Sequence, residues 1–131
     1  MPAMRATLLK AIEDLKKEVV TMADMVLNNI EESFKAFKEN DVVKATDIMK
    51  RDNLVDKLEE DIAKNALRVI WKQQPMAEDL RMVTGILKLI TDLERIGDHA
   101  VDISEITEHI GSLSNERLLP KTTKLSEDAY K

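Results

Sequence analysis

Carboxylates at helical spacing are the side chains of this sequence best suited to chemistry. The stretch "DLERIGDHAVDI", residues 92–103, places Glu94, Asp98 and Asp102 four residues apart, with Gly97 between the first two acids. Residues four apart lie on one face of an α-helix, so the stretch presents a ladder of oxygen ligands. Gly97 costs a helix interior roughly 1 kcal/mol relative to alanine. We therefore expect it to allow a backbone or a ligand to come close to the acids.

A second pair of acids lies in "RDNLVDKLEEDI", where Asp52 and Asp56 are also four residues apart. Asp52 interrupts a predicted line of core residues, at a position where an apolar side chain is expected. The line consists of Ala45, Ile48, Val55, Leu58, Ile62, Ala66 and Val69. If the two stretches belong to antiparallel helices joined near Pro75, residues at equal height have numbers that sum to about 150. Asp52 then lies level with Asp98, and Asp56 lies level with Glu94.

Four carboxylates at one height repel each other unless they are protonated or bridged by cations. We therefore predict a metal site at Asp52, Asp56, Glu94 and Asp98, and Asp102 extends the same stripe as a further ligand. Oxygen ligands without thiolates suit iron as Fe³⁺, manganese or magnesium, and several carboxylates can bridge more than one ion. The predicted cofactor is thus a divalent or trivalent cation, in a site of one or more ions.

Other readings of the same acids stay open. They form either a solvated helix face whose charges pair with Lys57 or Arg95, or the centre of a metal-storage protein or metal-dependent enzyme built on a helical bundle. The Glu-x-x-His spacing of ferritin-like di-iron sites is absent from the sequence. No nucleophile is paired with a base, and no Gly-rich loop is available to cradle a phosphate. We predict no catalytic residue and no organic-cofactor site, and hence no enzyme.

Three amphipathic helices must position the acids. Apolar residues recur every three or four positions over residues 5–39, 42–74 and 77–111, which predicts three long helices. The connections between them are short, so neighbouring helices run antiparallel. Gly111 is predicted to end the third helix as a C-cap. The predicted fold is all-α, an antiparallel three-helix bundle.

The predicted domain organisation follows from these helices. Residues 1–111 form the three-helix unit, and residues 112–120 form a linker. Residues 121–131 are predicted to start a further, fourth helix, and we interpret them as the beginning of a second repeat that has been truncated.

Composition excludes several classes of protein. The net charge of −5 and the aromatic content of 3% argue against a nucleic-acid binder. The 131 residues contain no cysteine, which rules out disulfides and thiolate metal sites and fits a cytoplasmic protein. No apolar run approaches the length that a membrane span requires.

With these motifs in hand, the chain resembles the PhoU family of phosphate-uptake regulators. The resemblance runs from about Met22 to Ile106 and rests on "DNLVDKLEEDI", "QQPMAEDLRMV" and "DLERIGDHAVDI". It implies one three-helix repeat of a fold that normally contains two, with metal clusters on the acidic motifs of some members. Asp52 and Asp56 match the second-helix acids, and Glu94 and Asp98 match the third-helix motif.

The resemblance also implies a role. Family members act as negative regulators of the phosphate-starvation response, between the ATPase subunit of the phosphate ABC transporter and a sensor histidine kinase. They are cytoplasmic, and they reach the inner membrane through their partners. Because a lone repeat leaves the surface for its partner repeat uncovered, we also expect this chain to form a homodimer or another homo-oligomer.

Overall fold

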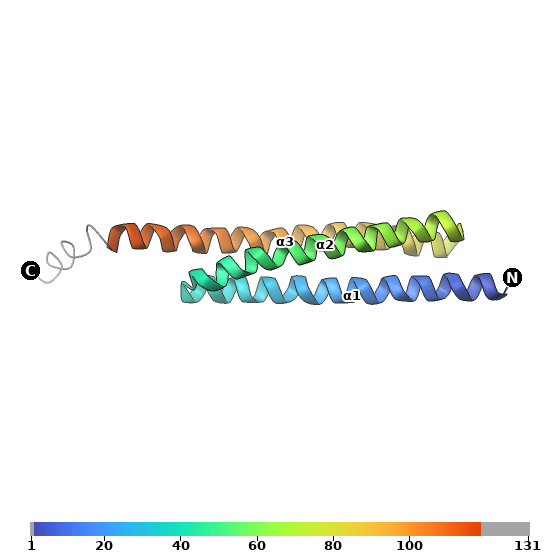
Figure 1. Ribbon diagram of the computed structural model, residues 1–131, viewed down its shortest axis with the longest axis horizontal. Coiled ribbons are helices and arrows are strands. Elements are labelled where there is room, and N and C mark those ends of the chain that lie inside the picture. The colour runs from blue at the N-terminus through green and yellow to red at the C-terminus, as the bar shows by residue number, and fades with distance from the viewer. Residues whose placement is uncertain (1, 119–131) are drawn as a thin grey trace, which may run out of the picture.

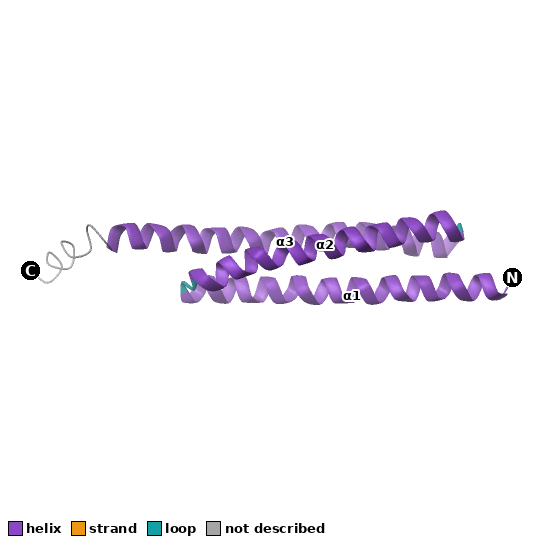
Figure 2. Cartoon of the chain, viewed as in Figure 1, coloured by secondary structure: helices purple, strands orange, loops and turns teal. Residues whose placement is uncertain are grey.

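Three long helices account for nearly all of the residues that the structure describes. The computed structural model describes residues 2–118. α1 spans Pro2–Glu39, α2 spans Val42–Gln73 and α3 spans Ala77–Leu118. Figure 2 shows loops only at the two turns between these helices. The predicted all-α class and its three helices are confirmed.

The helices form an antiparallel bundle in which each helix packs against both others (Figure 1). α1 and α3 run in one direction, and α2 runs in the opposite direction, crossing from the end of α1 to the start of α3. The N-terminus and the α2–α3 turn therefore lie at one end of the bundle, and the α1–α2 turn lies toward the other.

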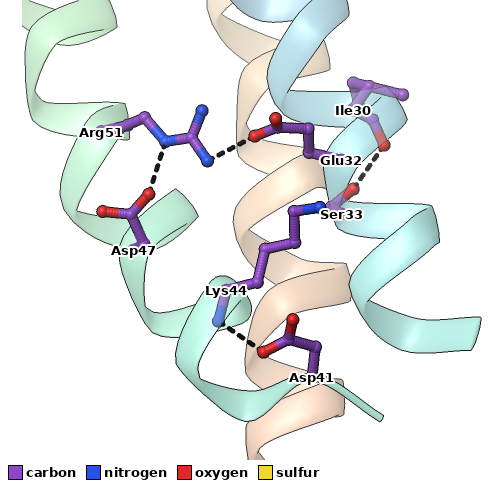
Figure 3. A network of polar contacts seen from close by, with 7 residues as sticks. All are labelled: Ile30, Glu32, Ser33, Asp41, Lys44, Asp47 and Arg51. Carbon is purple, nitrogen blue, oxygen red and sulfur yellow. Dashed lines mark hydrogen bonds and ion pairs between the residues drawn. The ribbon is translucent and has the colours of Figure 1, made fainter. Parts of the chain in front are cut away.

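Local side-chain and backbone chemistry explains both turns. Asp41 caps α2, because its side chain accepts a hydrogen bond of 3.0 Å from the backbone N–H of Lys44 (Figure 3). Gln74 ends α2 in the left-handed conformation, with φ of 45°, and its N–H donates to the carbonyl of Ile70. Pro75 follows and is buried, which fixes where the chain turns back.

The hydrophobic core consists of two clusters of buried side chains. The larger cluster contains large side chains such as Leu15, Met22, Ile62 and Ile90, each at most 1% exposed. Burying one such side chain contributes about 1.5–3 kcal/mol. The smaller cluster lies toward the α1–α2 turn and consists of three alanines, Ala36, Ala45 and Ala100, together with Ile48. Small side chains let the helices approach closely there.

No helix of the described part of the chain is apolar over a stretch long enough to cross a membrane.

A polar contact ties α1 to α2 near their turn. Arg51 on α2 pairs with Glu32 on α1, and its Nε lies 3.0 Å from Asp47 Oδ2 on its own helix (Figure 3). Ser33, one residue beyond Glu32, is fully buried and donates to the carbonyl of Ile30. Of these contacts only the Arg51–Glu32 pair joins the two helices, and it adds little stability because partly exposed ion pairs contribute little.

The end of the third helix differs from the prediction. Gly111 is not a C-cap, since α3 continues as helix to Leu118 through the first part of the predicted linker, residues 112–120. Gly111 is instead the point where α3 passes the start of α2. A Cβ at this position would overlap Cγ2 of Val42. The predicted start of a fourth helix, residues 121–131, lies outside the described residues.

Candidate metal centre

Three carboxylates from two helices converge near the middle of the α2–α3 interface. Asp56 and Glu59 lie on neighbouring turns of α2, and Glu94 lies opposite them on α3. One oxygen from each of these carboxylates lies within 4.8 Å of the others. All three side chains are half-buried. We call Asp56, Glu59 and Glu94 the carboxylate triad, a geometry in which one cation can contact three ligands.

Two further predicted ligands border the triad. Asp52 is half-buried one turn before Asp56, and Asp98 is exposed one turn after Glu94. Burial raises the pKa of Asp52 to about 6, with further contributions from the charges of Asp56, Asp98 and Glu94. The helical register expected from the sequence therefore brings these four acids into one electrostatic cluster.

The triad itself carries excess negative charge. Burial raises the pKa of Glu59 to about 7, assisted by a side-chain hydrogen bond to Glu94 and by the charges of Glu94, Asp56 and Glu60. The pKa of Asp56 is also raised, first by burial and then by the charge of Glu94. Both shifts have the same origin, because the acids meet in a partly dehydrated interface without a compensating positive charge.

Glu59 is absent from the predicted ligands, although the sequence contains a signal for it. The core line of α2 alternates steps of three and four residues through Ala45, Ile48, Asp52 and Val55, and its next step leads to Glu59. The prediction instead assigned Leu58 to this line. In the structure both side chains are half-buried. Acids at the expected core positions of α2, at residue 59 as at residue 52, are thus the feature that marks the site.

Gly97 is buried on the side of α3 that faces Asp52. A Cβ on Gly97 would lie 3.5 Å from Oδ1 of Asp52, 3.7 Å from Cγ2 of Val26 and 3.8 Å from Cγ1 of Val55, which are ordinary contact distances. Alanine therefore fits, whereas a longer side chain would occupy the space beside the carboxylate. The expected close approach is that of the α3 backbone to Asp52.

Neither of the cations proposed to neutralise these acids does so. Lys57 pairs with Asp61, at 3.7 Å, and Arg95 pairs with Asp92, at 3.8 Å. Within residues 5–113, whose side chains are described, no lysine or arginine forms an ion pair with the triad. The arrangement is therefore not a solvated face paired through Lys57 or Arg95.

Asp102 lies apart from the triad. It is exposed on α3, and its Oδ2 is 4.0 Å from Nδ1 of His99. Together with Glu105 and His109 it lines a shallow surface depression formed by α3 alone. Its charge does not contribute to the raised pKa values of Asp52, Asp56 or Glu59.

The residues present fit a hard cation. The triad offers carboxylate oxygens only, which suits iron as Fe³⁺, manganese or magnesium better than softer metals. Burial is the main cause of the raised pKa of Glu59, and a positive ion there would offset the repulsion between carboxylates that adds to it.

Comparison with known proteins identifies the family. The family model for the PhoU domain matches residues 19–107, which include the triad, Asp52 and Asp98. The chain belongs to the PhoU family.

Relatives of this PhoU chain carry names from phosphate transport. It is 41% identical over 98 residues to the phosphate-specific transport system accessory protein PhoU homolog of Aquifex aeolicus (strain VF5), a match that covers 75% of this chain and 44% of that protein. The PhoU homolog of Clostridium acetobutylicum is 37% identical over 100 residues, covering 76% and 46%. PhoU of Escherichia coli (strain K12) is 37% identical over 89 residues, covering 68% and 37%. The chain thus spans less than half the length of these relatives.

Proposed function

We propose that this PhoU chain is a cation-binding regulatory module that regulates phosphate uptake and restrains the phosphate-starvation response. Membership of the PhoU family and the names of its relatives support the link with phosphate transport. The observation that carries the metal-binding part is the carboxylate triad, because its acids meet without a positive side chain between them.

A bound cation would act on the shape and charge of the surface. It would draw Asp56 and Glu59 on α2 toward Glu94 on α3, with Asp52 and Asp98 beside them. It would convert a repulsive negative cluster into a fixed surface that another protein can recognise. The module then works without chemical turnover, as an adaptor rather than an enzyme.

The proposed partners are cytoplasmic components of phosphate uptake. They are the ATPase subunit of the phosphate ABC transporter and a sensor histidine kinase, and the module reaches the inner membrane through them. The named relatives, which are accessory proteins of phosphate-specific transport, support the first of these partners. Long exposed helix faces suit such contacts with partner helices.

A metal-storage protein or a metal-dependent enzyme is the second candidate, favoured only by the three clustered carboxylates. Both candidates predict metal binding, so turnover and storage assays must separate them. Bound metal without oxidase activity, phosphatase activity or accumulation of many ions per chain supports the adaptor. Metal-dependent turnover that is lost with the triad supports the enzyme.

The metal test uses the whole chain stripped with a chelator. Titration with Fe³⁺, Mn²⁺ and Mg²⁺ should show binding to the wild type and its loss when Asp56, Glu59 and Glu94 become Asn, Gln and Gln. The matched control is D102N/E105Q, which removes two acids of α3 that lie away from the triad. Equal binding by the wild type and the triad variant would contradict the site.

The regulatory test measures an alkaline phosphatase reporter in phosphate-rich medium. Deletion of the gene should switch the reporter on, and the wild type should silence it again. The quadruple alanine variant of Asp52, Asp56, Glu94 and Asp98 should fail to silence it. A deletion strain with a silent reporter would contradict the regulatory role. A fully active quadruple variant would contradict only the role of the metal.

A further inference from the structure

The last turns of α2 carry an exposed aromatic and apolar patch at the end of the bundle. Trp71 is 82% exposed, Met76 is 79% exposed and Leu67 is 56% exposed. Leu67 and Trp71 are one helical turn apart and therefore share a face of α2. Met76 follows in the turn to α3. We call Leu67, Trp71 and Met76 the tip patch.

The turn holds Met76 in its outward position. Pro75 beside it is buried, whereas Met76 is exposed. Gln74 before them and Ala77 after them have φ values of 45° and 51°. Non-glycine residues adopt this left-handed conformation only where the surrounding structure imposes it. The backbone is therefore constrained on both sides of Pro75 and Met76.

Three cations of α2 run beside Leu67 and Trp71, although the chain as a whole carries −5 and the acids Glu78 and Asp79 follow soon after Met76. Residues 62–77 contain no acid, but they contain Lys64, Arg68 and Lys72. These three cations follow one another at i, i+4 along α2, beside Leu67 and Trp71. Arg68 donates to Oδ1 of Asn65 at 3.5 Å. Lys64 and Lys72 have no ion pair within the part of the chain that the structure describes.

We propose that the tip patch is the docking surface for an acidic, amphipathic segment of a partner protein. Apolar side chains of the segment cover Leu67, Trp71 and Met76, and its carboxylates meet Lys64 and Lys72. Tryptophan and methionine are enriched in the buried centres of protein interfaces, where a single tryptophan can dominate affinity. Complementary charge around such a centre fixes specificity and speeds association.

The charge count favours a protein over an anionic membrane. Recognition of acidic lipids ordinarily takes clusters of about four to eight basic residues, each contributing about 1 kcal/mol. Only three basic residues of α2 lie beside the tip patch: Lys64, Arg68 and Lys72. Trp71 lies twelve positions after Glu59 in the sequence, about 18 Å along α2. The tip patch is therefore separate from the carboxylate triad, and its proposed role does not depend on a bound cation.

Trp71 is the single tryptophan of the chain, and its fluorescence therefore reports directly on the tip patch. The test selects peptides from a random displayed library against the immobilised whole chain, with counter-selection on the triple variant K64E/W71A/K72E. The selected peptides are then titrated into the free protein. We expect enrichment of peptides that combine acidic and apolar residues, with a saturable blue shift of Trp71 emission.

Charge variants and a matched control make the result specific. K64E/K72E keeps the tryptophan and should weaken peptide binding about tenfold or more. Leu54→Ala, a change of a 60% exposed leucine elsewhere on α2, should leave the affinity unchanged. Circular dichroism checks that all variants fold.

Three outcomes would overturn the proposal. The first is a selection that enriches no peptide, or only peptides without an acidic excess. The second is equal binding of the selected peptides by K64E/K72E. The third is a blue shift with vesicles of phosphatidylglycerol and phosphatidylcholine in the absence of any selected peptide, which would assign the tip patch to a membrane surface.

Discussion

Glu59 on α2 and Glu94 on α3 share a side-chain hydrogen bond. Two carboxyl groups can share such a bond only if one is protonated and donates to the other. The contact therefore joins the two helices through a proton when no cation is present. A proton and a metal ion compete for the same pair of side chains.

Stability of the metal-free protein should fall as pH rises through neutrality. Because the pKa of Glu59 is raised from 4.5 to about 7 in the folded state, its stabilising effect is complete below its ordinary value and is lost as pH rises through about 7. Asp52, with a pKa raised from 3.8 to about 6, acts in the same direction at lower pH. Urea unfolding in EDTA at several pH values between about 4 and 8 measures the trend.

Glu59→Gln isolates the contribution of the shared proton. Glutamine stays neutral and still donates to Glu94, so the decline above about pH 5 should become shallower. Glu105→Gln is the control, because Glu105 is an exposed acid of α3 whose charge does not contribute to the pKa of Glu59. Parallel curves for the wild type and Glu59→Gln would show that the raised pKa has no influence on folding.

Metal affinity should depend on Glu59 and not on Asp102. Glu59→Gln removes a ligand of the triad, and we expect it to weaken cation binding by more than about tenfold, since even outer-shell changes cost this much. Asp102→Asn should change little, because Asp102 lies beside His99. Isothermal titration with Mn²⁺ measures both, and a larger loss for Asp102→Asn would reverse the assignment.

Two glycines of α3 should respond to alanine in opposite directions. Gly85→Ala should raise stability by about 1 kcal/mol, because its Cβ meets nothing within 4 Å and alanine favours the helix. Gly111→Ala should lower stability by about 1–3 kcal/mol, because its Cβ overlaps Val42. In the double variant Gly111→Ala/Val42→Ala most of the loss should disappear. Thermal unfolding measures both variants. A higher melting temperature for Gly111→Ala than for Gly85→Ala would contradict the packing of α3 on α2.

Ser104 should be replaceable by alanine with a gain in stability. Its side chain is fully buried on α3 and its Oγ has no hydrogen-bond partner among the described residues. Removing an unsatisfied buried hydroxyl should stabilise the fold by about 1 kcal/mol. Ser33→Ala is the matched control, since the equally buried Ser33 donates to Ile30 and should lose stability. Equal losses in chemical denaturation would mean that Ser104 is satisfied in solution.

An apolar face on α1 and α3 gives the predicted self-association a location. On α1, an exposed apolar stripe starts at Val20, two residues after Glu18. Glu18 accepts a hydrogen bond from Asn65 of α2. At 100° per residue, the stripe therefore lies about 200° around the helix axis from this contact with α2. On α3, Ile96 stands in the same relation to Glu94. Both stripes repeat every seven residues and lie away from α2: Val20, Leu27, Phe34, Met82, Leu89 and Ile96.

The chain should therefore dimerise through this face at high micromolar concentration. Leu27→Lys/Leu89→Lys should convert the dimer to a monomer, because two charges would enter an apolar contact. Leu54→Lys, on the exposed side of α2, should leave the dimer intact. Sedimentation equilibrium measures the mass, and a monomeric wild type would rule out self-association.

Periodicity predicted most of the fold because each helix carries a regular core line. The starts of α2 and α3 were predicted at Val42 and Ala77, where Asp41 and Pro75 give strong local signals. The end of α3 was missed because Gly111 resembles a C-cap in sequence. Its contact with Val42 depends on how two distant segments meet, which local patterns do not contain.

The sequence predicted which turns of the second and third helices bring acids together, and it did not point to Glu59; that these acids hold a cation stays a prediction. Arithmetic on helix height brought Asp56 level with Glu94, since a rigid hairpin leaves little freedom in register. The rotation of a residue about the helix axis is harder to predict. The sequence therefore favoured Leu58 over Glu59 and added Asp102, which follows the spacing of the ladder but lies beyond the contact with α2.

The triad draws its ligands from α2 and α3 only. These helices are joined covalently at the turn after Gln73, so a cation held by Glu59 and Glu94 would close a ring of about 35 residues. If the cation stayed bound to both carboxylates while the rest of the fold opened, the ring would restrict the opened chain by about 3–4 kcal/mol, by the chain-entropy estimate for a cross-link. The cation would thus serve as a removable cross-link, and α1, outside the ring, would be the helix freest to separate.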